Sequence, residues 1–168
     1  NGQLVDTKIT FGKSLIKKHQ INSNIKSYSS KIIAEELFHL AHLSGAYSRF
    51  KIDNNFSNQD FINLYDEWLK KSVTREIADE VFVYINQEEI VGFVSVTIEN
   101  KIGSIGLIAV NPHHQGKNIG THLINEVENF LVSKNISELH VPTQKMNKMA
   151  CQFYTKNKFN IISNQHIY

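Results

Sequence analysis

A short turn between an apolar run and a helical pattern constrains the fold of this chain more than any other segment. The run Ile105–Val110 has the length and composition of a buried strand. After the turn, apolar residues recur at helical spacing, at Leu123, Ile124, Val127, Phe130 and Leu131. A strand, a glycine-bearing turn and a helix in this order leave backbone N–H groups unpaired at the positive end of the helix dipole. Such a turn is a binding site for anions.

The residues of this turn favour a pyrophosphate as the anion. Gly116 and Gly120 have no side chain, so a phosphate can approach their backbone closely, and Lys117 adds a mobile positive charge. The patterns G-x-G-x-x-G and G-x-x-x-x-G-K-[ST], which bind dinucleotides and nucleoside triphosphates, are both absent from the sequence. We therefore expect the pyrophosphate of another cofactor to lie against six consecutive residues, Gln115, Gly116, Lys117, Asn118, Ile119 and Gly120.

The pattern Gln115-x-x-Asn118-x-Gly120 resembles the acyl-CoA loop of the GNAT family of N-acetyltransferases, Gln/Arg-x-x-Gly-x-Gly/Ala. Asn118 takes the place of the middle glycine, and Asn is the non-glycine residue that best tolerates a positive φ. The resemblance implies acetyl-CoA as the co-substrate. It also implies that the preceding strand pairs with pantetheine through its backbone, and that one of its N–H groups holds the thioester oxygen as charge develops. The residues expected in this role are Ile108, Ala109 and Val110.

A second run, N-x-x-A-x-x-F-Y-x-x-x-x-F from Asn147 to Phe159, resembles the family signature N-x-x-A-x-x-F/L-Y-x-x-x-G-F, with Lys158 in place of the glycine. In the family the tyrosine lies beside the thioester sulfur, where a phenol can donate a proton to the departing thiolate. The resemblance therefore implies Tyr154 as the general acid, whereas a tyrosine packed on its helix is the structural alternative. Asn147 either hydrogen-bonds the pantetheine arm or caps its helix, and the sequence alone favours the cap.

Hydrophobic periodicity predicts an α/β (α+β) fold, taken as a single domain over residues 1–168. The resemblance implies the GNAT acyl-CoA N-acyltransferase fold, a mixed and mostly antiparallel sheet with helices on both faces and a splayed strand pair that binds the cofactor. A second resemblance, described below, implies an additional N-terminal segment upstream of Asn1. We expect strands at Leu4–Phe11, Glu80–Ile85, Ile90–Glu99, Ile102–Val110, Ile136–Val141 and Phe159–Tyr168. We expect helices from a Ser30 cap to Gly45, from an Asn58 cap onward, from the turn to Lys134, and at Asn147–Lys156.

Composition narrows the classes of partner. The net charge of +2 says little about nucleic acid, but the sequence has no basic block and no interleaved basic and aromatic residues, so we expect no nucleic-acid partner. No apolar run approaches the roughly 18 residues that span a bilayer. Cys151 is the only cysteine, which excludes an intrachain disulfide and suits the cytoplasm. His39 and His42 stand at i and i+3, but no further ligand completes a metal site, so we expect none. Whether the protein is a homodimer stays open.

The first half of the chain carries a second resemblance that bears on the acceptor. The segment Leu43–Asp53, followed by Phe61-x-x-x-Tyr65-x-x-Trp68-Leu69, resembles the dTDP-fucosamine (dTDP-4-amino-4,6-dideoxyhexose) acetyltransferases. Those enzymes acetylate the 4-amino group of a nucleotide-linked deoxysugar for polysaccharide biosynthesis. Arg49 and Lys51 could then meet the two phosphates, and flat side chains could meet the sugar or the base. The flat side chains are Tyr47, Phe50 and Phe56; a salt bridge for Arg49 and a core position for Phe50 are the structural alternatives.

Three other functions stay open at this point. The acceptor could instead be a protein N-terminus, a polyamine or an aminoglycoside, and the last two would favour an acidic cleft. The chain could also be an acyl-CoA sensor without catalysis, or a phosphate-binding regulator, although neither needs the proton donor that Tyr154 supplies. For direct transfer to an amine, Glu99 or Asp53 could receive the amine proton through a water chain.

Overall fold

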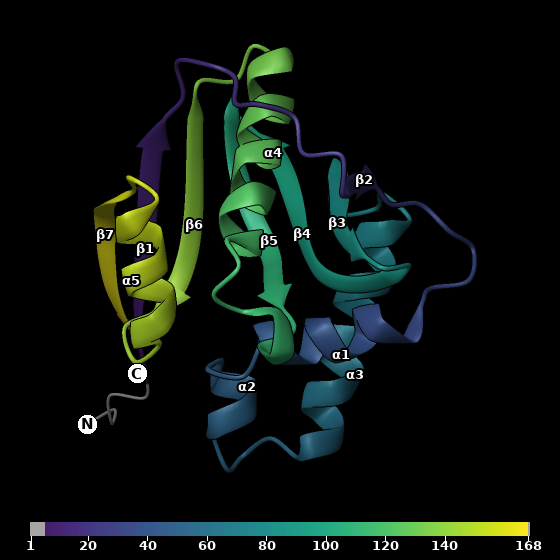
Figure 1. The fold of residues 1–168 in the computed structure, drawn as a ribbon. Helices are drawn as coiled ribbons and strands as arrows, with labels where there is room; N and C mark the ends of the chain where they lie inside the picture. Colours follow the sequence, from purple (N-terminus) through teal and green to yellow (C-terminus); the bar gives the residue numbers. More distant parts are fainter. Residues whose placement is uncertain (1–5, 168) are drawn as a thin grey trace.

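One twisted sheet runs through the computed structural model, which describes residues 6–167 (Figure 1). Its seven strands stand in the order β2-β3-β4-β5-β6-β1-β7, and β5 and β6 form the parallel pair among otherwise antiparallel neighbours. The strands are β1 (Asp6–Ser14), β2 (Ile25–Ser27), β3 (Glu80–Asn86), β4 (Glu89–Glu99), β5 (Ile102–Val110), β6 (Glu138–Gln144) and β7 (Asn160–Ile167).

Helices cover both faces of this sheet. On one face lie α1 (Glu35–Ser44) and α3 (Asn58–Val73), with the one-turn α2 (Arg49–Ile52) between them in the chain. On the other face lie α4 (Ile119–Ser133) and α5 (Lys148–Lys156) (Figure 1). Each face has its own buried cluster, which includes Leu37, Leu69 and Phe93 under α1 and α3, and Leu123, Leu139 and Tyr154 under α4 and α5. The expected mixed sheet with helices on both faces is therefore confirmed.

Several boundaries differ from those expected. Ser57, not Asn58, caps α3, and it forms a capping box with Asp60. Helix α1 begins at Glu35 rather than after Ser30, whose hydroxyl bonds the backbone of Ile32 in a local turn. The first strand extends to Ser14 because β6 continues to pair with it up to that residue. Strand β2 and helix α2 were not expected as elements, and residues 4, 5 and 168 of the expected terminal strands lie outside the described residues.

Two irregularities of β5 shape the middle of the sheet. Val94 pairs with Ile108 and Val96 with Ile105, so β5 has one residue more than β4 between these pairs. This bulge is closed by Ser95, whose Oγ accepts a hydrogen bond from the backbone N–H of Leu107 at 2.9 Å. On its other side, β5 pairs with β6 only at Gly103–Leu139 and Ser104–His140 within the described residues. Beyond Ser104 the two strands diverge, which confirms the splayed pair.

Among the helices of residues 6–167, none combines the length and the hydrophobicity of a membrane-spanning segment.

Candidate active site

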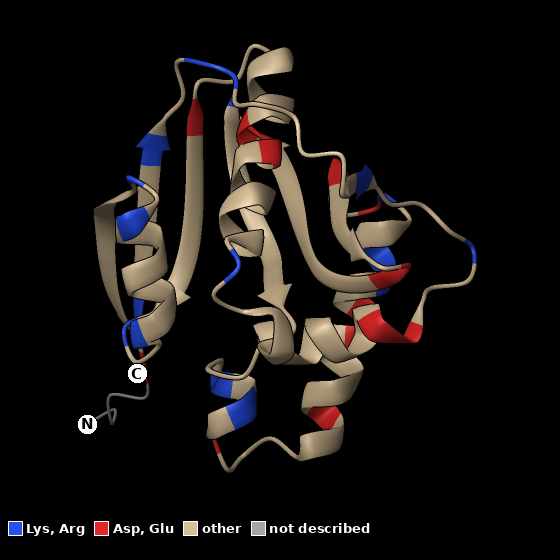
Figure 2. Cartoon of the chain, viewed as in Figure 1, with Lys and Arg blue, Asp and Glu red and all other residues tan. Residues whose placement is uncertain are grey.

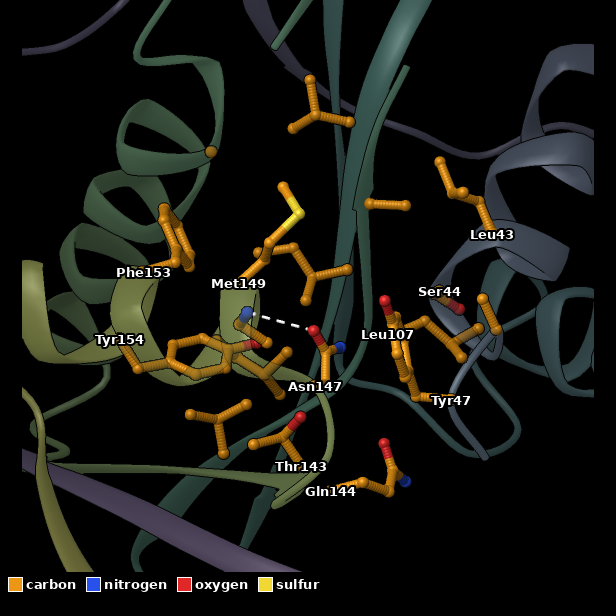
Figure 3. A pocket seen from close by; sticks show the side chains of 18 of the residues that line it. Leu43, Ser44, Tyr47, Leu107, Thr143, Gln144, Asn147, Met149, Phe153 and Tyr154 are labelled. Carbon is orange, nitrogen blue, oxygen red and sulfur yellow. Dashed lines mark hydrogen bonds between the residues drawn. The ribbon is translucent and has the colours of Figure 1, made fainter. Parts of the chain in front are cut away.

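The diverging ends of β5 and β6 border a cavity of about 860 Å³. One side of the cavity is formed by the turn after β5 and the start of α4, and the other by β6 and α5. The connection from α1 into α2 borders it on the opposite face of the sheet. Figure 3 shows Phe153, Tyr154 and Met149 on one side of this space and Leu43, Ser44 and Tyr47 on the other. The cavity therefore passes through the sheet and is lined by residues from both of its faces.

The turn between β5 and α4 presents its backbone to this cavity. Gly116 has a φ of 78°, and a Cβ at this position would meet no atom within 4 Å, so the glycine is needed for conformation and leaves open space in front of it. Asn118 has a φ of 61°, the left-handed conformation that we expected it to tolerate in place of glycine. The first hydrogen bond of α4 runs from the N–H of His122 to the carbonyl of Asn118 at 2.9 Å. The N–H groups of residues 119–121 thus lack helical partners.

The expected pyrophosphate residues gather at this turn, with one exception. Five of the six line the cavity, namely Gln115, Gly116, Asn118, Ile119 and Gly120. Lys117 is exposed and does not line the cavity, so its part in binding stays a prediction. At Gly120 a Cβ would lie 3.0 Å from two ring atoms of Phe153, so the missing side chain lets α4 and α5 approach each other closely.

The wall that leads from the turn into the sheet is β5 itself. Ile108, Ala109 and Val110 all line the cavity beyond the last β5–β6 pair. On this side of β5, among the described residues, no strand pairs with their backbone. The Nε2 atom of Gln115 donates to the carbonyl of Val110 at 3.3 Å, which ties the turn back to the strand. The arrangement offers an extended ligand a strand edge inside the cavity.

Tyr154 reaches the cavity from α5 and is only 3% exposed. Its ring packs among those of Phe11, Phe153 and Phe159, with centroids 5.3 to 5.6 Å away. Figure 3 shows its hydroxyl directed toward the middle of the cavity. Burial, and to a lesser extent the neighbouring thiol of Cys151, raises the pKa of the Tyr154 hydroxyl well above its ordinary value, so the group stays protonated at neutral pH.

Backbone hydrogen bonds at the C-terminal end of α5 also fix the position of Tyr154. The N–H of Phe159 donates to the carbonyl of Tyr154 at 3.0 Å, and the N–H of Lys158 donates to that of Thr155 at 3.1 Å. These two bonds form a Schellman motif, with Lys158 at the left-handed position and a φ of 70°. Lys158 therefore adopts the conformation that a glycine usually takes at this point.

Asn147 caps α5, as the sequence favoured. Its Oδ1 accepts a hydrogen bond from the N–H of Ala150 at 3.1 Å, drawn as a dashed line in Figure 3. Asn147 also lines the cavity, and its Nδ2 makes no hydrogen bond to the described part of the chain. The cap and a contact to a ligand are therefore compatible.

The opposite face of the cavity contains the residues expected to meet an acceptor. Tyr47, Arg49 and Phe50 line it, from the end of α1 into α2. The guanidinium carbon of Arg49 lies 5.3 Å from the ring centroid of Phe50 and 5.6 Å from that of Phe56. Its Nε is buried and, within residues 6–167, has no hydrogen-bond partner. The salt bridge considered for Arg49 is not formed with any described residue.

Other candidates from the sequence lie away from the cavity. Lys51 bonds Asn58, and neither Lys51 nor Phe56 lines the space. Glu99 ends β4 at the β4–β5 hairpin, the far end of the sheet from the turn, and Asp53 accepts bonds from Asn55 in its own turn. Several residues that line the cavity were not predicted from the sequence, including Asp6 and Lys8 of β1 and Gln144 of β6.

Figure 2 shows basic positions on α2 and α5, the two short helices that border the cavity. Among its described lining residues, Lys8, Arg49 and Lys156 are cationic and Asp6 is the one carboxylate. Within residues 6–167, no three His, Cys, Asp or Glu side chains gather as a metal site would require. The cavity thus suits a ligand with anionic groups better than a polycation.

Sequence comparison agrees with the fold and the two signatures. Residues 38–159 match the model of the Acetyltransferase (GNAT) family, and the chain belongs to this family. It is 26% identical over 110 residues to streptothricin acetyltransferase A of Bacillus subtilis, a match that covers 65% of this chain and 64% of that protein. The alignment therefore leaves more than a third of that relative's length uncovered.

Solved structures support the same fold. The PaiA N-acetyltransferase of Thermoplasma acidophilum, in complex with coenzyme A, superposes with a TM-score of 0.61 at 19% identity, over 79% of this chain and 87% of that one. A Bacillus subtilis acetyltransferase in complex with CoA gives a TM-score of 0.61 at 17% identity, over 83% of this chain and 78% of that one. A GNAT acetyltransferase from Staphylococcus aureus gives 0.61 at 23% identity, over 83% and 85%.

Proposed function

We propose that this chain, as a single domain, is an N-acetyltransferase that moves the acetyl group of acetyl-CoA to a primary amine. The observation that carries the proposal is that one cavity joins the glycine-bearing turn, the free edge of β5 and the buried phenol of Tyr154. Family membership supports the reaction class, and two similar structures hold coenzyme A. A sensor that only binds acyl-CoA would need no protonated hydroxyl at the inner end of the cavity.

In this proposal the donor lies along the turn and β5. The unpaired N–H groups at the start of α4 receive the pyrophosphate, and the open space in front of Gly116 admits it. Pantetheine then extends along the free edge at Ile108, Ala109 and Val110, and Asn147 Nδ2 is available to it. A backbone N–H of this edge stabilises the thioester oxygen as it becomes negative.

The transfer is direct and needs no acyl-enzyme. The neutral amine attacks the thioester carbonyl, and the nitrogen–carbon bond forms as the nitrogen loses one proton to a base or to water. The carbon–sulfur bond then breaks. Tyr154 donates its proton to the departing thiolate of coenzyme A, and its raised pKa ensures that the proton is present. Holding both reactants in one cavity supplies much of the acceleration.

For the acceptor, we propose an amine that also carries anionic groups, with the 4-amino group of a dTDP-linked amino-deoxysugar as the example that fits the resemblance. Arg49 supports this class, because the residue lines the cavity and forms no ion pair with the described residues, and its guanidinium lies near two aromatic rings. A nucleoside diphosphate would supply the missing counter-charge through bidentate contacts. A second candidate is a streptothricin-like amine, which is favoured by the curated relative but not by the three cationic lining residues.

The test is thiol release from acetyl-CoA with a panel of acceptors. The panel contains a dTDP-4-amino-4,6-dideoxyhexose, streptothricin, a polyamine, an aminoglycoside and a peptide with a free N-terminus. We expect release with the nucleotide sugar, and we expect Arg49→Gln to raise the KM for it by about 10- to 100-fold, as for the loss of a charged hydrogen bond. Lys51→Gln is the matched control, because Lys51 lies outside the cavity and its loss should leave KM unchanged.

Three other outcomes of this panel separate the alternatives. Release with streptothricin alone would support the acetyltransferase activity and exclude the nucleotide sugar as the acceptor. Release with no amine, while acetyl-CoA still raises the melting temperature, would indicate a sensor. If acetyl-CoA neither reacts nor binds, the proposed function is refuted.

A further inference from the structure

The acceptor half of the cavity holds a buried carboxylate, on the face of the sheet opposite Tyr154. Side chains alternate along β1, and Ile9 and Phe11 point into the cluster that contains Tyr154. Asp6 and Lys8 therefore point to the other face, and Lys8 stands opposite Gln144 of β6. All three residues line the cavity. An amine that approaches from the α1–α2 side meets this face first.

Asp6 is buried without a counter-charge from any residue between 6 and 167. It is 5% exposed, and its Oδ1 accepts one hydrogen bond, from the N–H of Thr7 at 2.7 Å. It forms no ion pair with the described residues, although Lys8 follows two positions later on the same strand. A carboxylate is costly to bury unless it is paired or hydrogen-bonded. The buried carboxylate of Glu128, for comparison, binds both Lys13 and His19.

The other carboxylates considered as a base lie outside the cavity. Asp53 and Glu99, the candidates from sequence, lie in a turn outside the cavity and at the far hairpin. Among the described lining residues, Asp6 is the one acidic side chain. An amine brought to the thioester therefore finds one carboxylate on its own side of the sheet.

We propose that Asp6 receives the acceptor amine and takes its proton, an inference that rests on the proposed transfer. The carboxylate binds the amine and orients its lone pair toward the thioester carbonyl. As the nitrogen–carbon bond forms, one N–H proton passes to the carboxylate oxygen, directly or through one water. The carbon–sulfur bond then breaks, and Tyr154 protonates the sulfur. Solvent carries the proton from Asp6 back to Tyr154, so the protein ends the cycle unchanged.

This assignment gives acid and base to opposite faces of the sheet, with the thioester between them. The other titratable or charged groups that line the cavity around Asp6 are Lys8, Tyr47, Arg49, Tyr65, His114 and Lys156. None of them combines a negative charge with a position in the acceptor half. The lysines and the arginine repel an ammonium ion, so Asp6 alone makes this half favourable for an amine.

The test compares Asp6→Asn, Asp6→Glu and the control Asp53→Asn in steady-state kinetics between pH 6.5 and pH 9. We expect Asp6→Asn to lower kcat/KM for the amine by about 100-fold near neutral pH, the lower end for a general base. The loss should shrink as the pH rises toward the pKa of the free amine, because an amine that arrives neutral needs less help from a base. Asp6→Glu keeps a carboxylate and should recover part of the activity, and Asp53→Asn should match the unmodified protein.

A measurement of acetyl-CoA binding distinguishes a catalytic role of Asp6 from a purely structural one. Asp6→Asn should leave unchanged the increase in melting temperature that acetyl-CoA causes, because Asp6 is assigned to the acceptor. The inference is overturned if Asp6→Asn keeps full activity. It is also overturned if the variant loses activity equally at every pH and loses donor binding with it. If the unmodified protein transfers acetyl to no amine, the proposed function itself fails.

Discussion

Replacing Lys158 by glycine should stabilise the protein, because Lys158 occupies the left-handed position of the Schellman motif behind Tyr154. With a φ of 70°, its Cβ is crowded against the backbone in a way that glycine avoids. The left-handed conformation costs a residue with a side chain about 1–2 kcal/mol. Glycine also increases the entropy of the unfolded chain, which lowers the stability by about 0.4–1 kcal/mol. The net gain in the free energy of unfolding is therefore about 0.5–1 kcal/mol.

Thermal unfolding measures this gain. For a chain of this size, 1 kcal/mol corresponds to about 2–4 °C, so Lys158→Gly should melt about 1–4 °C higher. Lys156→Gly is the matched control, because Lys156 lies in the last turn of α5 and glycine in a helix costs about 1 kcal/mol. The two variants should therefore shift the melting temperature in opposite directions. Equal destabilisation by both would refute the assigned backbone conformation and the motif that holds the end of α5.

Tyr154 and Gly116 give two further predictions. Tyr154→Phe should lower turnover by about 10²- to 10⁴-fold in the thiol-release assay while the Kd for coenzyme A stays unchanged, and full activity would remove Tyr154 from the mechanism. The same variant tests the titration of Tyr154. Burial raises its pKa, so above about pH 10 the unfolded chain loses a proton that the folded protein keeps. Stability should therefore fall as the pH rises through that range, and fall less steeply in Tyr154→Phe, as chemical denaturation would show. Gly116→Ala should cost about 1–2 kcal/mol of stability through its φ of 78°. It should also weaken coenzyme A binding by about tenfold in calorimetry, or about 1.4 kcal/mol, because the new methyl group fills the open space of the turn; an unchanged Kd would place the pyrophosphate elsewhere.

The parts of the site that could be predicted from the sequence are local ones. The strand, turn and helix around Gly116 follow one another in the chain, so spacing alone placed them correctly. The left-handed conformation of Asn118 was also foreseeable, because few residue types tolerate it. The same is true of the Asn147 cap, which uses a backbone N–H three residues away.

What could not be predicted depends on pairing between distant segments. Asp6 enters the cavity because β1 pairs with β6, more than a hundred residues later in the chain. Sequence alone also leaves Glu99 as a candidate base, but its pairing with Ile102 puts it at the end of the sheet away from the cavity. Strand β2 has three residues and is defined by its pairing with β3, so it has too little pattern to be recognised. Ser57 and Asn58 are both good caps, and only the capping box with Asp60 decides between them.

The divergence of β5 and β6 separates the residues proposed to hold the donor from those proposed to act as acid and base. The turn and the edge that would hold the donor belong to β5 and α4, whereas Tyr154 and Asp6 belong to α5 and β1, on the β6 side. Within the part of the chain that the structure describes, the two sides pair as strands at Gly103–Leu139 and Ser104–His140, at one end. A small rotation about this end would carry the proposed acid and base together relative to a bound thioester. One angle would therefore set both proton-transfer distances at once, and a bound donor, wedged between the two sides, would fix that angle.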